Sequence, residues 1–500
     1  MTSADAPEQD RQQEREGERG GGDGEGRSPR VALTARGRRV APAAAAAALV
    51  VAAVAVVAFA GGGGGGGSAS PPASSAAKLV PANALVYVHL STDRDRAATR
   101  DAGDVAAAFP SWPALRDGLI QRLQAPGCDV AAKALKTADE AALAIFDTSG
   151  GSRANSLVLV DTGRQHPGAK QQGCGTLTST YVGTFLAIGQ PESLLLAGRL
   201  AKGQGASLAD AAGPKAQFAK LPGDRVADGW LSADGIRRLL APQGGLLGAA
   251  GVLFDQAALK GAAFGVSAKG DQIHLSVHSQ LDPKLVKGGS GSGFKPFKPT
   301  LAADVPADAM AYLGVSNLAP ALQRLLAAAG TSSATLKPLV GQLSAPLLKV
   351  FPGEAAIILT SKTPAPVLTL LARTRDEGAT RKALADLPAA VRKSFSTAVW
   401  DGKVAVSTDA SGIAAVKAGG KHLADTPNWS KAVGNHPESV SSILFLDFSR
   451  LLTLGEATGL SDSSAYRAAK ADLQKVRAIG AATSGTSSES TAEIDLLITS

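Results

Sequence analysis

The feature that most constrains the fold of this chain is an internal repeat. The stretch VPANALVYVHLS, Val80–Ser91, reappears as VPADAMAYLGVS, Val305–Ser316, and later matched stretches keep a spacing near 212 to 225 residues. Self-similarity at one fixed spacing is typical of a repeated structural unit. We therefore predict a tandem duplication of a unit of about 200 residues, covering residues 78–282 and 300–500, which we call the first half and the second half.

Each half reads as a mixture of short strands and helices. ALVYVHLS and AMAYLGVS alternate as strands do, and Asp401-Gly402 is a hairpin signal that Gly183 matches in the first half. Strands that follow one another with short turns favour an antiparallel sheet. We expect an α+β fold, with helices on one face of the sheet in each half. The linker, residues 283–299, is rich in Gly, Ser, Lys and Pro.

Aromatic residues are scarce, at 4% of the chain. Those that recur in both halves, such as Tyr87 and Tyr312, are predicted to lie in the core. Trp112 and Trp429 have no such counterpart and are candidates for the surface. With so few aromatics, base stacking is poorly supported, and we predict no nucleic-acid partner.

Residues 1–77 differ in composition from the rest of the chain. Residues 1–39 are rich in Gly, Glu, Arg and Gln with few large apolar groups, so we predict disorder. Residues 40–60, VAPAAAAAALVVAAVAVVAFA, carry no charge and as a helix would extend about 31 Å, the thickness of a bilayer core. We predict one transmembrane helix there, followed by a Gly/Ser/Pro tether at 61–77.

Basic residues directly before the span predict its orientation, and they are Arg30, Arg36, Arg38 and Arg39. No basic residue follows until Lys78. The positive-inside rule then places the N-terminus in the cytoplasm and residues 61–500 outside the cell membrane. The AFA sequence that ends at Ala60 also fits a signal-peptidase site, so cleavage after Ala60 is the alternative to a retained anchor.

Cys128 and Cys174 are the two cysteines of the chain. In an oxidising compartment they are expected to form a disulfide, which would contribute about 4 kcal/mol in the chain-entropy model. The second half has a predicted helical stretch at 376–395 where the first half has GRQHPGAKQQGCG, so the bond would hold a segment without that helix. The alternative is a pair of separate buried thiols.

A search for catalytic motifs finds no phosphate-binding loop and no nucleophile elbow. His274 and His278 lie on one face of a predicted strand, about 13 Å apart, which is too far to share a metal ion. We therefore predict no catalytic residues, no cofactor, no metal and no enzymatic activity. Carboxylates that meet only in the folded protein would escape this search.

The formal net charge is +8, and residues 1–39 contain equal numbers of basic and acidic side chains. The basic excess therefore lies in residues 61–500. Such an excess suits an anionic surface, although a solvated surface without a particular partner is the more common explanation.

The basic-flanked span, the tether and the stretch LVPANALVYVHLS followed by FPSWPALRDGL resemble the bacterial family of domain of unknown function 3352. This resemblance covers most of residues 78–500 and implies a membrane-anchored protein with no known catalytic residues. The sequence thus predicts a single-pass, extracytoplasmic binding or scaffolding protein of the cell envelope, whose partner is an envelope protein or an apolar ligand. The alternatives are an envelope hydrolase and an apolar-ligand carrier, each using a cleft between the halves.

Overall fold

The computed structural model describes residues 71–72, 74–123, 133–135, 137–147, 154–240, 258–286, 296–316, 318, 353–362, 365–387 and 389–499. All of them belong to one compact unit of the chain. The predicted disordered segment with its four arginines, the predicted span 40–60 and Cys128 lie outside these residues. Among the helices that are described, none is long and apolar enough to cross a bilayer.

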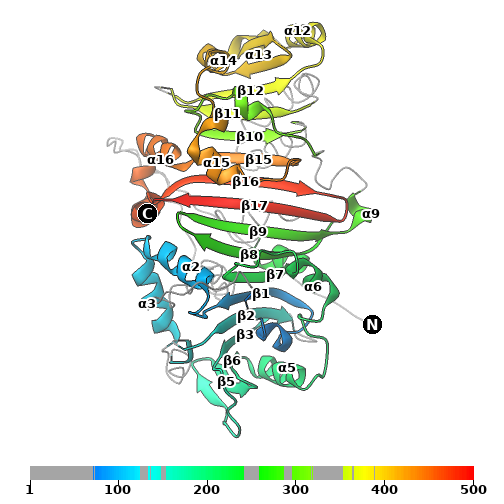
Figure 1. Ribbon diagram of the computed structural model, residues 1–500, viewed down its shortest axis with the longest axis vertical. Coiled ribbons are helices and arrows are strands. Elements are labelled where there is room, and N and C mark those ends of the chain that lie inside the picture. The colour runs from blue at the N-terminus through cyan, green and yellow to red at the C-terminus, as the bar shows by residue number, and fades with distance from the viewer. Residues whose placement is uncertain are drawn as a thin grey trace, which may run out of the picture. The chain divides into compact units, whose positions relative to one another are not determined.

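One large antiparallel sheet dominates the fold (Figure 1). Its first-half strands are β1 (Ala84–Ser91), β2 (Glu140–Asp147), β3 (Ala154–Asp161), β4 (Gln172–Cys174), β5 (Leu177–Val182), β6 (Phe185–Gly189), β7 (Ala227–Ser232), β8 (Leu259–Lys269) and β9 (Gln272–Leu281). Its second-half strands are β10 (Ala311–Val315), β11 (Ala355–Thr360), β12 (Val367–Arg373), β13 (Ser396–Trp400), β14 (Lys403–Ser407), β15 (Ser442–Asp447), β16 (Val476–Gly485) and β17 (Glu489–Ile498). The predicted α+β class with an antiparallel sheet is confirmed.

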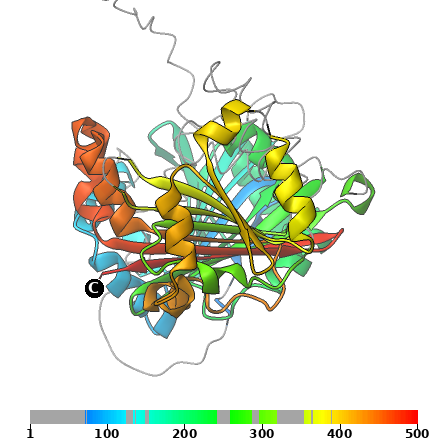
Figure 2. The same ribbon diagram turned by 90° about the horizontal axis from the view of Figure 1, so that it is seen from above.

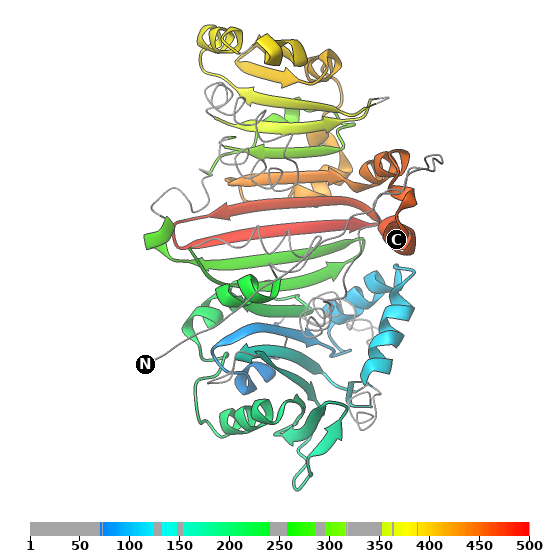
Figure 3. The ribbon, with the colours of Figure 1, turned by 180° about the vertical axis from the view of Figure 1, so that it is seen from behind.

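Strand pairing follows the same order in the two halves. The first half pairs as β4–β5–β6–β3–β2–β1–β7–β8–β9. The second half pairs as β13–β14–β12–β11–β10–β15–β16–β17. The last strands of the halves, β9 and β17, pair with each other and join the two runs into one sheet, as Figures 1 and 3 show.

The register of β9 and β17 is centred on one residue pair. Ser276 lies opposite Glu493, and two residues away on either side His274 faces Asp495 and His278 faces Thr491. The strands on either side of this junction pair in equivalent registers. In the first half, Trp230 of β7 faces Ala263 of β8. The corresponding residues of β15 and β16 are Phe445 and Gly480, which also face each other. Equivalent residues of the two halves can therefore be compared one by one.

Helices lie on both sides of the strands (Figure 2). The first-half helices are α2 (Ala97–Ala107), α3 (Trp112–Leu123), α5 (Pro191–Ala201), α6 (Ala212–Phe218) and α7 (Ala233–Gly235), with the 3-10 turn η2 (Ala76–Leu79) and the π-helical turn η3 (Ile236–Leu240). The short helix α9 (Pro283–Val286) begins the linker. The second-half helices are α12 (Glu377–Ala385), α13 (Ala389–Ser394), α14 (Ala410–Lys417), α15 (Pro427–Val433), α16 (Phe448–Ala457) and α17 (Ser464–Leu473), with η4 (Leu301–Asp304), η5 (Leu423–Asp425) and η6 (Leu460–Asp462).

The prediction that helices cover one face of the sheet is wrong. Phe218 of α6 packs in a core cluster with Ala263 of β8, whereas Val105 of α2 packs with Val266 of the same strand. Residues of opposite parity on a strand point to opposite faces. β1 and β6 are buried along their whole length, and a strand buried on both faces needs cover on both.

Local sequence signals mark two hairpin turns and several helix starts. The Asp401-Gly402 turn has positive φ at both residues, 45° and 68°, and joins β13 to β14. Gly183, with φ of 62°, forms the matching turn between β5 and β6. Side chains that accept a backbone N–H at a helix start are Asp376, Asp409, Thr426, Asp447 and Ser463.

The core corrects two expectations drawn from the sequence. Tyr87 and Tyr312 are fully buried, as predicted, but Trp112 and Trp429 are buried as well. The indole of Trp429 packs against Tyr312 and Phe445, with ring centroids 5.3 and 5.6 Å apart. Ala76 and Ala77, which the sequence assigned to the tether, are buried in the first-half core, so the folded region begins before residue 78.

Candidate functional site

One cross-strand row of side chains differs between the two halves. Read across the sheet on one face, the row is Ala142, His89, Asp228, Gly265, Ser276, Glu493, Ala482, Ile443, Gly314 and Ala356. His89 and Asp228 of the first half occupy the positions of Gly314 and Ile443 in the second. The polar residues of the row therefore all lie between His89 and Glu493. Every residue of the row beyond Glu493, in the second half, is apolar.

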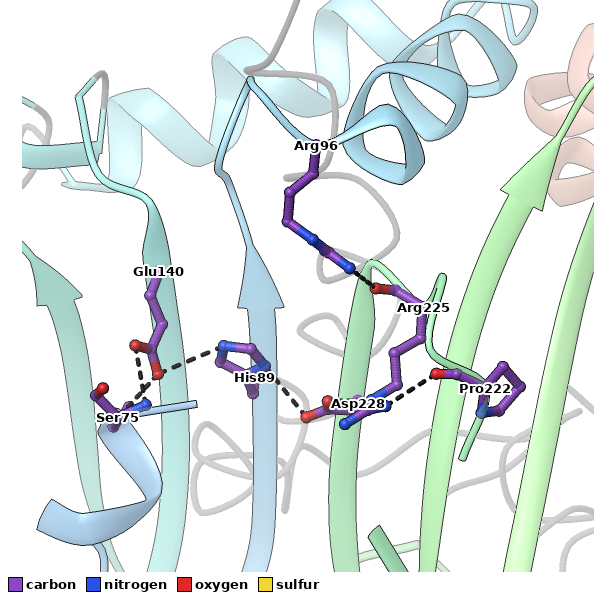
Figure 4. A network of polar contacts seen from close by, with 8 residues as sticks. Ser75, His89, Arg96, Glu140, Pro222, Arg225 and Asp228 are labelled. Carbon is purple, nitrogen blue, oxygen red and sulfur yellow. Dashed lines mark hydrogen bonds and ion pairs between the residues drawn. The ribbon is translucent and has the colours of Figure 1, made fainter. Parts of the chain in front are cut away.

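The polar part of this row contains a buried ionic network (Figure 4). His89 is 0% exposed, and its Nδ1 lies 3.1 Å from Oδ1 of Asp228. Its Nε2 lies 3.4 Å from Oε1 of Glu140. Nε of Arg225 donates a 2.6 Å hydrogen bond to the second carboxylate oxygen of Asp228. Two cationic groups and two carboxylates thus alternate across the first-half strands.

The electrostatics of this network favour the charged forms of His89 and Asp228. Burial lowers the pKa of His89, but the carboxylates of Asp228 and Glu140 outweigh burial and raise the pKa above its ordinary value. Burial raises the pKa of Asp228, but His89 and Arg225 outweigh it and lower the pKa. A buried charge is tolerated when it is paired and hydrogen-bonded, and these charges are.

Glu140 belongs to a feature that the two halves share. Its carboxylate accepts backbone N–H groups of Ser75 and Ala76, at 3.1 and 2.7 Å, and so caps η2. In the second half Glu354 accepts the N–H groups of Thr300 and Leu301, at 2.5 and 2.9 Å, and caps η4. Because both halves contain this cap, Glu140 is explained by the fold. His89, Asp228 and Arg225 are not.

Arg225 connects the buried network to a surface loop. Its Nη1 donates to the carbonyl of Pro222 at 2.8 Å. Nη2 of Arg96 donates to the carbonyls of Arg225 and Gly223, at 3.1 and 3.4 Å. The loop from Lys220 to Arg225 is therefore held by two guanidinium groups, which bind the carbonyls of Pro222, Gly223 and Arg225. In the second half, the equivalent of Arg225 is Val440.

This loop forms one wall of a cleft of about 610 Å³ over the junction of β9 and β17. The first half contributes Lys220, Pro222 and Asp224 to that wall. The second half contributes the segment 432–437, with Ala432, Val433, Asn435, His436 and Pro437. The floor is formed by the polar residues of β9 and β17 around the central Ser276–Glu493 pair.

A second ionic group lies on the cleft floor. Nδ1 of His274 lies 2.8 Å from Asp495, and its Nε2 lies 3.0 Å from Glu493. Hydrogen bonds with these two carboxylates raise the pKa of His274 to about 10. Burial, by contrast, lowers the pKa of His278. His274 belongs to the first half and its two partners to the second, so this group joins the halves.

An apolar pocket of about 290 Å³ occupies the opposite face of the same strands. It is enclosed by α2 and α3, by the strands β7, β8, β9 and β17, and by the end of α17. The lining side chains include Val105, Phe109, Trp112, Val266 and Leu496. Its one acidic lining residue, Asp472 of α17, accepts the backbone N–H of Ser111 at 3.0 Å. The central strands are thus polar on one face and apolar on the other.

The structure tests part of the predicted site chemistry. His274 and His278 both line the cleft, which confirms that they share a face of the strand. Among the described side chains, no group of three His, Cys, Asp or Glu residues could hold a metal ion. Cys174 is buried, and no cysteine in the described part of the chain is free. Its pairing with Cys128 remains a prediction.

Sequence reasoning missed the buried network, although the repeat contained a signal for it. Aligning the two halves places His89 against Gly314 and Asp228 against Ile443. A polar residue that replaces an apolar one inside an equivalent buried strand marks a difference in role. What the sequence could not show is that His89, Asp228 and Arg225 meet.

Comparisons with known proteins add little to this description. No family model matches the chain, and no curated protein matches it. A solved structure titled "Structure of crystal form I of TP0453" aligns with 46% of this chain and 89% of its own length. The identity is 11% and the TM-score 0.24, so this similarity carries no argument. The resemblance to the domain of unknown function 3352 family remains a prediction.

Proposed function

We propose that this protein is a membrane-anchored, extracytoplasmic binding protein whose ligand is an apolar chain held in the pocket behind the central strands. The observation that carries this proposal is the pocket lining. Its walls are Ala, Val, Ile, Leu, Phe and Trp side chains together with Ser111, and the one carboxylate among them already accepts a backbone hydrogen bond. Concave apolar sites with few polar groups are the common form of small-ligand sites.

The proposed anchor supports a lipid as the source of that chain. Between Ala60, the end of the predicted span, and Ser74, where the continuous described region begins, there are few residues. A stretched tether of this length reaches at most about 50 Å. The start of the folded region would therefore stay near the bilayer, where acyl chains are abundant.

The two-half architecture is part of the same proposal. The shared pairing order, the shared Glu140 and Glu354 caps and the matched hairpins support a tandem duplication of one α+β unit. The apolar pocket lies where α2 and α3 of the first half meet α17 of the second. A site of this kind requires both halves, which gives the duplicated chain a use that a single copy lacks.

The proposal treats the protein as non-catalytic. Both ring nitrogens of His274 are engaged by carboxylates, so neither is available as a base. His89 lies between Asp228 and Glu140 but has no exposed surface through which a substrate could reach it. The hydrolase alternative would therefore need residues other than these two histidines.

The pocket can be tested with 11-dansylaminoundecanoic acid, a fluorescent fatty acid, and the full-length chain in detergent micelles. We expect saturable binding with enhanced, blue-shifted fluorescence. Ala102 of α2 is a buried residue of the pocket lining, and Ala102→Phe should weaken binding at least about tenfold by filling the pocket. Ala107→Phe, on an exposed position of the same helix, is the matched control and should bind as the wild type does. Equal binding by both variants would contradict the proposal.

A further inference from the structure

The second half serves as an internal control for the buried network of the first. The same strands, in the same register, are built there with Gly314, Ile443 and Val440 in place of His89, Asp228 and Arg225. Gly314 is required by its neighbours, because a Cβ atom there would lie 2.7 Å from Tyr312 Oη and 2.9 Å from a methyl group of Ile443. The fold is thus compatible with an apolar row.

Buried ion pairs are a poor route to stability. Replacing such a group with packed apolar residues is often neutral or stabilising by about 1–4 kcal/mol. A fold that already uses the apolar solution in one half does not need the ionic one in the other. The presence of His89, Asp228 and Arg225 in the first half therefore points to a role beyond holding the sheet together.

The contacts of Arg225 with the cleft wall indicate that role. Arg225 reaches from the buried network to the Pro222 carbonyl, and its aliphatic stem lies over Gly265, where a Cβ atom would be 3.2 Å from Arg225 Cδ. None of His89, Arg225 and Asp228 lines the cleft. They act through the loop from Lys220 to Arg225, which does. The network fixes the first-half wall of the cleft.

The charges inside the cleft compensate one another. Lys220, Lys269 and protonated His274 balance Asp224, Glu493 and Asp495. Lys220 is paired with Glu489 at 2.5 Å, and both floor carboxylates are engaged by His274. The cleft therefore offers no net charge to an ionic ligand.

What remains for a ligand is a set of neutral hydrogen-bonding groups. His278, Ser267 and Asn435 line the cleft, and their side chains make no hydrogen bond with other residues that the structure describes. The Ser267 hydroxyl and the Asn435 amide each contain a donor and an acceptor. Burial lowers the pKa of His278, so its imidazole is neutral near pH 7 and can also donate and accept. A cavity of about 610 Å³ is in the range of small-molecule sites.

We propose that this cleft binds a small neutral ligand rich in hydroxyl and amide groups, and that His89, Asp228 and Arg225 are positioning residues for its wall. This site is separate from the apolar pocket, which lies on the other face of the strands. Failure of either proposal leaves the other standing.

The binding test uses isothermal titration calorimetry with the full-length chain and triacetylchitotriose, which carries both hydroxyl and acetamide groups. Maltotriose separates the hydroxyl contribution, N-acetyl-trialanine amide separates the amide contribution, and sialyllactose is the charged comparison. We expect triacetylchitotriose to bind and sialyllactose to bind at least about tenfold more weakly. Absence of binding by all three neutral probes, or tighter binding of sialyllactose, overturns the proposed site.

The location is tested by His278→Ala and Asn435→Ala. Each is expected to weaken triacetylchitotriose binding about tenfold, as the loss of a ligand hydrogen bond does in a desolvated site. His166→Ala is the matched control, because this histidine contacts Thr162 and Tyr181 and does not line the cleft. Unchanged affinity in both cleft variants overturns the location.

The positioning role is tested by the triple variant His89→Gly/Arg225→Val/Asp228→Ile, which installs the second-half residues in the first half. We expect it to fold, to show faster amide hydrogen exchange at residues 220–225, and to bind triacetylchitotriose about tenfold more weakly. A purely structural role would change exchange across the first-half strands and leave the affinity of the folded protein unchanged. Wild-type affinity in the folded triple variant overturns the positioning role.

Discussion

The two halves of this protein fill equivalent buried positions of the sheet with side chains of different chemistry. In the second half, Gly314 and Ile443 meet across β10 and β15 and fill the space with hydrocarbon. In the first half, His89 and Asp228 meet across β1 and β7 and form an ion pair. Since strand order, register and the glutamate caps agree, the difference isolates the residues that the fold does not require.

The shared and unshared residues therefore divide by role. Glu140 and Glu354 perform the same task at the start of each half, so they belong to the fold. Arg225 has no charged counterpart and extends toward the cleft, so it belongs to the site. The two halves of this chain thus allow a comparison of equivalent residues that usually requires two related proteins.

The largest loss of stability is expected when one member of the network is changed alone. Asp228→Ile should lower the free energy of unfolding by about 3–5 kcal/mol, because Arg225 then stays buried without its carboxylate and His89 keeps only Glu140. Urea denaturation of the full-length chain, followed by circular dichroism, measures this. The reverse substitution, Ile443→Asp, should cost a similar amount, since it buries a carboxylate beside Gly314 and Val440. A loss below about 1 kcal/mol in both variants would contradict the network's coupling.

The disulfide is a second expected difference between the halves. β4 ends at Cys174 in the first half, where the second half has α12 and α13. The paired substitution Cys128→Ser/Cys174→Ser should lower the free energy of unfolding by about 4 kcal/mol. A mass two hydrogens below that of the reduced chain is the direct check on the bond. An unchanged mass on reduction would show that the cysteines are not bonded to each other.

The glutamate caps should contribute to stability in both halves. Glu140→Gln and Glu354→Gln each remove a charged acceptor from two backbone N–H groups, and each should cost about 1–3 kcal/mol. The first value should be at the upper end, because Glu140 also faces His89 at 3.4 Å. Urea denaturation of the two variants side by side measures the difference. A cost confined to one half would undermine the equivalence of the caps.

The smallest effect is expected at the contact that joins the halves. The pKa of His274 is about 10 in the folded protein and 6.5 without its partners. A raised folded pKa means that the contribution to stability is complete below about pH 6.5 and is lost as pH rises toward about 10. The stability difference between wild type and His274→Gln should therefore shrink between pH 6.5 and 10. A constant difference over that range would show that His274 is not charged through its contacts with Asp495 and Glu493.

The sequence predicted local structure better than it predicted the site. Hairpin glycines and the repeat itself depend on residues close in sequence or on direct self-comparison, and the predicted hairpins and the α+β class are confirmed. The cover on both faces escaped prediction because one strand's apolar run does not reveal which helix covers which side. The network escaped because His89, Asp228 and Arg225 meet only through the pairing of β1 with β7. The cleft needed the pairing of β9 with β17, which no local signal specifies.

The most direct test of the account is the stability of the triple variant His89→Gly/Arg225→Val/Asp228→Ile beside the single variant Asp228→Ile. Urea denaturation of the two full-length chains, under identical conditions, compares an apolar row with a broken ionic one. The account predicts that the triple variant unfolds within about 1 kcal/mol of the wild type or is more stable, while the single variant loses about 3–5 kcal/mol. A triple variant as unstable as the single one would show that the network holds the fold itself, and the division of roles between the halves would be wrong.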